Sequence, residues 1–304
     1  MVSRLRTVAW GGVLALALVV VSCGGPSQAQ TRDRRAAFVR DADEVCDAAF
    51  AKLAGGSQPR SYEALRDRMN RDAAALTSSG KDLHHLRDKL GDSASPQISA
   101  FDDRLDAVPT ATARISQDAE LHDAGATRHS ARRLREAYDA LYRAAGKATL
   151  RRCGRGGNRA ADLALFTVYR DEYVTVHADA ILRLERRQGG VQNFDAFHRY
   201  LRSGLRVFAN YRRRLARLAP PKVLRHSHRL LLRRSTRALR TGHRLLALLD
   251  RGQIAAINGG GRALLLALIH QANRSDAAEA SIRRILGFPR GHRSSPPPQG
   301  TDAA

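Results

Sequence analysis

Residues 223–250 read VLRHSHRLLLRRSTRALRTGHRLLALLD, and the spacing of their apolar side chains decides the fold class. The residues that recur every seven positions are Leu224, Leu231, Ala238 and Leu245, and leucines one position later widen this stripe. Such a period is typical of an α-helix that packs against a core. The arginines that fall mostly on the other side are Arg225, Arg229, Arg233, Arg237, Arg240 and Arg244. We therefore predict a helix with an apolar inner face and a basic outer face.

The same helical period covers most of the chain, and aromatic residues make up only 5% of it. A composition rich in Ala, Leu and Arg favours helix over sheet. Breaks rich in Gly, Pro, Ser and Asn separate the expected helices, which lie at about 34–53, 62–90, 96–122, 127–153, 159–187, 194–218, 222–250 and 262–288. We predict an all-α fold with two tandem antiparallel bundles of about four helices each, 34–156 and 157–289, and a disordered tail over 290–304.

The two halves also resemble each other in sequence. ADEVC at 42–46 matches ADAIL at 178–182, and TLRRCG at 149–154 matches IRRILG at 282–287. The offsets are 136 and 133, which one duplication with small loop changes explains. A chance match between helices rich in Ala, Leu and Arg is the alternative.

The duplication makes a prediction about the two cysteines of the first half. In this register Leu182 stands opposite Cys46, and Ile285 or Leu286 stands opposite Cys153. Both positions are then expected to be buried and close together in each bundle. The first bundle would join them covalently, and the second by apolar packing.

The N-terminus has the layout of a secretory signal peptide, because two arginines precede an uncharged apolar run at 8–21. This run is shorter than the roughly 20 residues of a membrane-spanning helix. The stretch VVSC at 20–23 resembles the lipobox of bacterial lipoproteins, in which the cysteine receives lipid after cleavage. The resemblance implies a signal peptide over 1–22, acyl chains on Cys23, a flexible tether over 23–33, and a place on the extracytoplasmic face of the cell membrane. The alternatives are an ordinary cleaved signal peptide and an uncleaved anchor helix.

The chain has three cysteines. If Cys23 carries lipid, Cys46 and Cys153 remain, and an oxidising compartment favours their pairing. We therefore predict a disulfide between them, which closes a loop of about 107 residues. Two buried free thiols are the alternative.

The net charge is +23, and removal of two signal-peptide arginines leaves +21. Residues 201–249 hold thirteen arginines, Lys222 and no acidic residue. We do not expect nucleic acid as the partner of an exported protein. Anionic lipid, an anionic wall polymer or an acidic protein fits this charge. The alternative is a solvated face, with arginine used where another genome uses lysine and its charge partly neutralised by the acidic first half.

No stretch indicates a metal site, a cofactor or catalysis. The histidines of HSH at 226–228 cannot both lie on one helical face, and HExxH, CxxC and GxSxG motifs are absent. NGGGR at 258–262 lacks the lysine of a phosphate-binding loop. We predict a non-catalytic binding or scaffold module without cofactor or metal; a small-ligand or metal-binding lipoprotein is the alternative.

Three features resemble uncharacterised helical lipoproteins of high-GC actinobacteria. They are the ADxxC motif at 42–46, the LxxLxPP helix junction at 215–221, and the closing motifs at Cys153 and Gly287. The resemblance covers most of the mature chain. It implies a lipid-anchored helical protein and brings no activity or catalytic residue.

Overall fold

The computed structural model describes residues 27–155, 158–186, 193–252 and 262–288. These residues form helices and contain no strand, so the prediction of an all-α fold is confirmed. The helices are α1 (Gln28–Ala54), α2 (Tyr62–Asp88), α3 (Pro96–Asp102), α4 (Ala107–Glu120), α5 (Ala124–Lys147), α6 (Asn158–Glu185), α7 (Phe194–Arg217), α8 (Arg225–Asp250) and α10 (Arg262–Ile285), with short 3-10 helices at Gly91–Ser93 and Lys222–Leu224.

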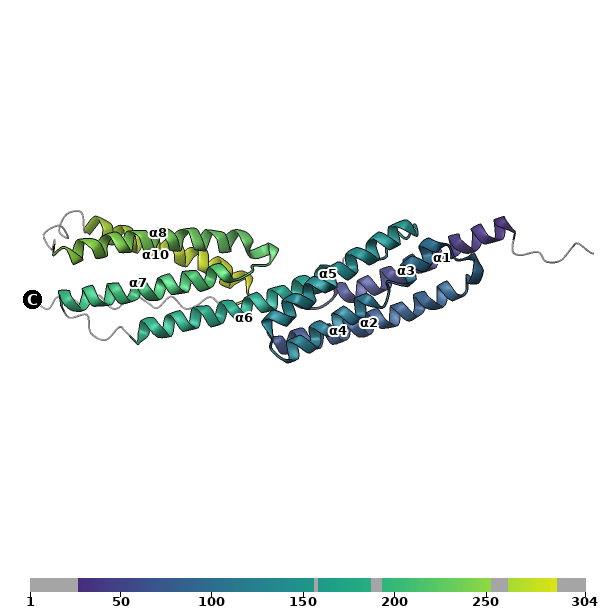
Figure 1. Ribbon diagram of the computed structural model, residues 1–304, viewed down its shortest axis with the longest axis horizontal. Helices are drawn as coiled ribbons and strands as arrows, with labels where there is room; N and C mark the ends of the chain where they lie inside the picture. Colours follow the sequence, from purple (N-terminus) through teal and green to yellow (C-terminus); the bar gives the residue numbers. More distant parts are fainter. Residues whose placement is uncertain (1–26, 156–157, 187–192, 253–261, 289–304) are drawn as a thin grey trace, which may run out of the picture.

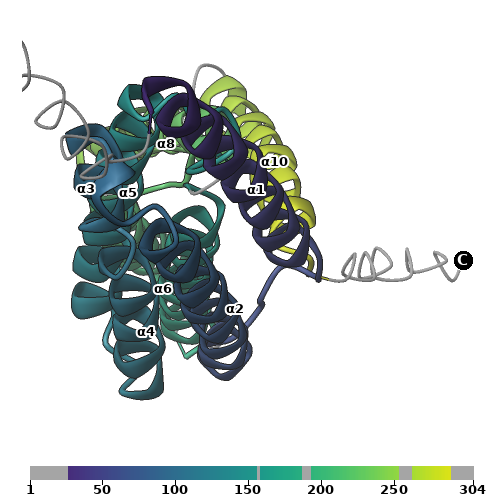
Figure 2. The same cartoon turned by 90° about the vertical axis from the view of Figure 1, so that its right-hand side faces the viewer.

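The helices form two groups that lie end to end along the long axis (Figure 1). In the first group α2 packs against α1 and α4, and α5 packs against α3, α4 and α6. In the second group α7 packs against α6 and α8, and α10 packs against α8. Figure 2 looks along the long axis and shows α1 to α5 in front of α8 and α10. Each group surrounds a hydrophobic core of its own.

Helix α6 belongs to both cores. Its first turns bury Ala161 and Ala164 in the first core, whereas Tyr169 and Tyr173 lie in the second. The expected boundary between bundles, at 156–157, lies outside the described residues. Because Ala161 and Ala164 come after this boundary in the sequence, the first core includes the beginning of α6, which we had assigned to the second bundle.

Helix α1 begins earlier than the sequence indicated. Ser27 and Gln30 form a capping box, in which the Ser27 hydroxyl accepts from the Gln30 amide at 3.3 Å and the Gln30 side chain accepts from the Ser27 amide at 3.1 Å. Residues 28–33, which we assigned to a flexible tether, are therefore helical, and that part of the domain prediction is wrong. Cys23, the apolar segment before it and the tail 290–304 lie outside the described residues.

The single helix expected at 96–122 is two helices, α3 and α4. The cause is Pro109, whose ring would clash with the Leu105 carbonyl in a continuous helix and which has no amide to donate. Tight turns replace the helix there, with the Leu105 amide donating to the Asp102 carbonyl at 3.0 Å. Pro109 then falls within the first turn of α4, where it is tolerated.

The predicted pairing of Cys46 with Cys153 is confirmed, with Cα atoms 5.0 Å apart. The disulfide ties α1 to the segment that follows α5. Asp43 supports it from one turn earlier on α1, because its carboxylate accepts from the amides of Arg151 and Arg152 at 3.1 and 2.8 Å. The return of the chain from α5 is thus fixed to α1 both covalently and by charge-assisted hydrogen bonds.

The matching apolar contact in the second group is absent. Leu286 is buried, but Leu182 is 51% exposed, so the prediction that these positions pack together is wrong. The end of α10 instead meets α6 three turns earlier, where the Arg170 guanidinium donates to the Leu286 carbonyl at 3.3 Å. The pairing of α10 with α6 therefore differs from the register that the repeat implied.

No helix in the described residues has the length and apolar character needed to cross a membrane.

The disulfide leads to a prediction about stability. Replacing both cysteines (Cys46→Ala with Cys153→Ala) should lower the free energy of unfolding by about 4–5 kcal/mol, because the open chain regains the entropy of a long loop. Urea denaturation followed by circular dichroism measures this. Oxidised and reduced wild-type protein provide the control, since reduction should reproduce the double variant. Equal midpoints for the oxidised and reduced forms would contradict the expected contribution.

Candidate anion-binding surface

Helix α8 carries the six arginines that the sequence singled out, and all six are exposed: Arg225, Arg229, Arg233, Arg237, Arg240 and Arg244. We call them the α8 basic face. Their steps of three and four residues place them on one side of the helix, over a length of about 28 Å. The opposite side is buried and includes Leu231, Ala238 and Leu245. The structure therefore brings together the residues that helical periodicity grouped.

Among the described residues, no carboxylate lies within ion-pair distance of any arginine of the α8 basic face. Nor do the acidic residues of the first group neutralise it, because the helices that pack against α8 are α7 and α10. Repeated like charges at i,i+4 cost a few tenths of a kcal/mol each. The face therefore carries unneutralised charge that an anionic partner can relieve.

Helix α7 adds a second row of cations that we did not single out from the sequence. Its exposed arginines without an ion pair in the described structure are Arg199, Arg206, Arg213 and Arg217. Their spacing of seven, seven and four residues puts them on one side of α7. Arg202 lies on the same side but pairs with Asp250. The spacing of these arginines within 199–217 is the sequence signal that predicts this row.

Close packing joins α7 to α8. Arg212 donates its Nε–H to the Thr236 hydroxyl at 2.7 Å, and Gly242 lets Leu205 approach the α8 backbone. A Cβ atom at residue 242 would lie 2.4 Å from Leu205 Cδ2, so only glycine fits without a shift. The two basic rows are thus carried by adjacent helices whose separation is set by side-chain contacts.

The second core also contains a polar cluster. His177 on α6 lies with its Nε2 atom 3.1 Å from Oε1 of Glu279 on α10, and its ring stacks on Tyr173. Burial raises the pKa of the Glu279 carboxyl to about 7. Burial, followed by the charge of Arg283, lowers the pKa of His177. The hydroxyls of Tyr173 and Tyr211 are buried in the same cluster.

His228 extends this cluster to α8. It is buried, and its Nδ1 atom lies 2.8 Å from the Tyr169 hydroxyl, which gives both groups a partner. Its neighbour His226 points to solvent, in agreement with the prediction that the two rings cannot share a face. In the described ranges, no three His, Cys, Asp or Glu side chains are grouped so that they could hold a metal ion.

No protein-family model matches the chain, and neither a curated protein nor a solved structure does. Its function is therefore inferred from its own residues.

Glu279 makes stability depend on pH. Its pKa of about 7 in the folded chain exceeds the 4.5 of a free glutamate, so folding takes up a proton between these values. The resulting stabilisation is complete below about pH 4.5 and is lost as the pH rises through 7. Relative to Glu279→Gln, the wild type should therefore lose about 2–3 kcal/mol of stability between pH 5 and 8.

Urea denaturation of both proteins at several pH values measures this difference. The lowered pKa of His177 makes the free energy of unfolding rise with pH, which is the opposite trend. Because His177 is present in both proteins, its contribution largely cancels in the difference between them. Glu44→Gln, which removes an exposed carboxylate from α1, is the matched control and should show no such trend. A difference between wild type and Glu279→Gln that stays constant with pH would contradict the expected coupling.

Proposed function

We propose that this protein is a lipid-anchored, non-catalytic binding module on the extracytoplasmic face of the cell membrane, and that α7 and α8 bind an anionic partner. The observation that carries the proposal is the α8 basic face, whose six exposed arginines have no carboxylate partner among the described residues. Arginine suits phosphate and carboxylate groups because its planar fork donates two parallel hydrogen bonds.

The extent of the surface favours an extended partner. A row of cations about 28 Å long, on a convex helix, suits a linear polyanion or an acidic protein better than a single small ion. Each arginine can engage a separate anionic group, and every added contact strengthens binding at low salt.

The position of the lipid anchor affects which class of partner the basic helices can reach. Only four residues lie between Cys23 and Gln28, the first residue of α1, so the chain can span at most about 17 Å between them. The start of α1 lies at one end of the molecule, and α7 and α8 lie in the other group (Figure 1). A molecule standing on its anchored end presents the basic helices away from the bilayer, which favours a wall polymer or an acidic protein over lipid headgroups.

Binding to polyanions tests the proposal. The mature chain without lipid is titrated with poly(glycerol phosphate) and, separately, with phosphatidylglycerol vesicles at several salt concentrations. The triple variant Arg229→Glu, Arg233→Glu and Arg240→Glu should bind the polymer at least about tenfold more weakly, with a smaller dependence on salt.

The matched control changes the net charge equally in the first group. It is the triple variant Arg104→Glu, Arg132→Glu and Arg143→Glu, whose arginines are also exposed and form no ion pair in the described structure. This control should keep most of the affinity. Equal losses in both triple variants would mean that binding follows net charge alone, and the proposed surface would then be wrong. Tighter binding to vesicles than to polymer would assign the surface to lipid headgroups.

A small-ligand-binding lipoprotein is the second candidate function. The observation that favours it is a cavity between the two helical groups, which is described next.

A further inference from the structure

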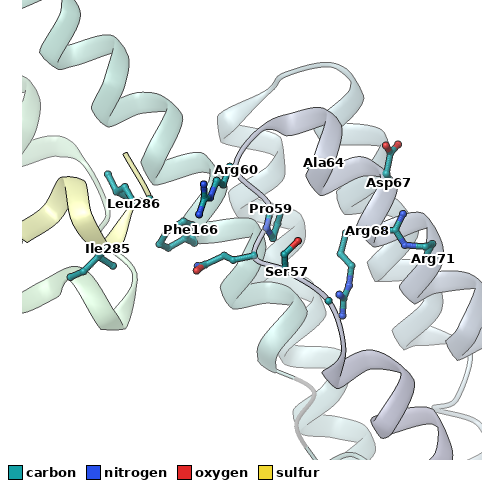
Figure 3. Close-up of a pocket in the computed structure, with 13 residues that line it drawn as sticks. Ser57, Pro59, Arg60, Ala64, Asp67, Arg68, Arg71, Phe166, Ile285 and Leu286 are labelled. Atoms are coloured by element: carbon teal, nitrogen blue, oxygen red, sulfur yellow. The ribbon is translucent and has the colours of Figure 1, made fainter. Parts of the chain in front are cut away.

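A cavity of about 650 Å³ opens where the two helical groups meet (Figure 3). We call it the junction cavity. Its walls come from the α1–α2 connection (56–60), the first turns of α2, Phe166 of α6, and the end of α10 (285–287). Its volume lies within the usual range of pockets for small organic ligands. Because these segments are far apart in sequence, only the complete fold creates the cavity.

Helix α6 fixes two of these walls. Arg170 donates one N–H to the Arg60 carbonyl and another to the Leu286 carbonyl, so it joins the α1–α2 connection to α10. Its guanidinium also lies 4.5 Å from the centre of the Phe288 ring. The Thr167 hydroxyl donates to the Pro59 carbonyl at 3.2 Å. The walls are therefore held by directional contacts rather than by loose surface loops.

Two charged residues of the cavity are already engaged. Arg68 is buried; it donates to both carboxylate oxygens of Asp72 at 2.9 and 3.0 Å, and to the backbone carbonyls of Leu53 and Gly55. Asp67 accepts from Arg66 at 2.8 and 3.0 Å. Neither of these charges is available to a ligand without breaking an existing contact.

Arg60 and Arg71 remain. Both line the cavity and are exposed to solvent. Among the described residues, no carboxylate lies within ion-pair distance of either guanidinium. Arg60 also lies close enough to Arg170 that, after burial, its charge lowers the pKa of Arg170. The cavity thus has a cationic rim, and an anion bound to Arg60 would relieve the repulsion between Arg60 and Arg170.

A glycine sets the position of Arg60. Gly287 has a φ of +73°, and a Cβ atom there would lie 2.8–2.9 Å from the Arg60 guanidinium. The positive φ favours glycine at residue 287, and a Cβ atom there would displace the Arg60 guanidinium. In Figure 3 the Arg60 side chain lies beside Phe166 and Leu286, which are almost fully buried, whereas Ile285 of the same wall is exposed.

We propose that the junction cavity binds a small organic anion: a phosphate or carboxylate group held by Arg60, with Arg71 adding to the positive field and an apolar body against the exposed side chain of Ile285. The hydroxyl of Ser57 and the amide of Gln58 on the same rim supply further hydrogen bonds. Because the ligand contacts segments from both helical groups, its binding also stabilises their junction. The site is separate from the α8 basic face.

Calorimetric titration of the mature, lipid-free chain tests the site. The probes are phenyl phosphate, benzoate and inorganic phosphate. Phenyl phosphate should bind saturably at one site, and inorganic phosphate at least about fivefold more weakly, because it lacks an apolar group to contact Ile285. Comparison of phenyl phosphate with benzoate shows which anionic group the arginines prefer.

Substitutions locate the site on the molecule. Arg60→Gln and Gly287→Ala should each weaken phenyl phosphate binding at least about tenfold, the first by removing the cation and the second by displacing it. Arg71→Gln should weaken it less. Arg143→Gln, an exposed arginine elsewhere in the first group, is the matched control and should bind as the wild type does. Circular dichroism and the melting temperature show that each variant is folded.

The triple variant of the α8 basic face separates this site from the proposed function. It should bind phenyl phosphate with unchanged affinity even if it no longer binds polymer. The proposal is overturned if phenyl phosphate shows no saturable binding up to about 10 mM, or if folded Arg60→Gln binds as tightly as the wild type. If the α8 triple variant loses phenyl phosphate binding but Arg60→Gln keeps it, the anion binds to α8 instead, and the proposal is likewise overturned.

Discussion

The whole structure depends on one uninterrupted helix that serves two hydrophobic cores. Helix α6 spans 28 residues; Ala161 and Ala164 pack in the first core, and Tyr169 and Tyr173 pack in the second. At 3.6 residues per turn these two sets of side chains point in roughly opposite directions from the helix. The two groups therefore lie on different sides of α6 as well as at different ends of it.

This shared helix explains where contacts between the groups occur. Arg128 of α5 pairs with Glu172 of α6 at 2.7 Å, just where α6 leaves the first core. Arg170, on a neighbouring turn, reaches the α1–α2 connection and the end of α10. The junction cavity lies beside these contacts. Its shape is therefore a consequence of the way in which α6 passes from one core to the other.

The second group separates its charges in space. Two of its aspartates form ion pairs inside the group: Asp179 accepts from Arg183 and Arg214, and Asp250 accepts from Arg202. Glu279 lies beside His177 between α6 and α10. The arginines of α8 and most of those on α7 point outward without such partners. A protein that needed only solubility would gain little from this arrangement, because mixed charges serve that purpose with less repulsion.

Local sequence by itself determined the helices and most of their ends, because apolar periodicity, caps such as Ser61 and Asn193, and breaks such as 154–158 act over a few residues. It also determined the α8 basic face and the Cys46–Cys153 pair. Local signals also mark two places where our predictions were wrong. The Ser27–Gln30 capping box marks the start of α1, and Pro109 marks the break between α3 and α4. Only the tertiary structure decided that Leu182 is exposed, that α6 serves two cores, and that segments around Arg60, Phe166 and Gly287 line one open cavity. The reason is physical: helical period fixes which side of a helix is apolar, but the register and crossing of distant helices follow from how whole faces pack.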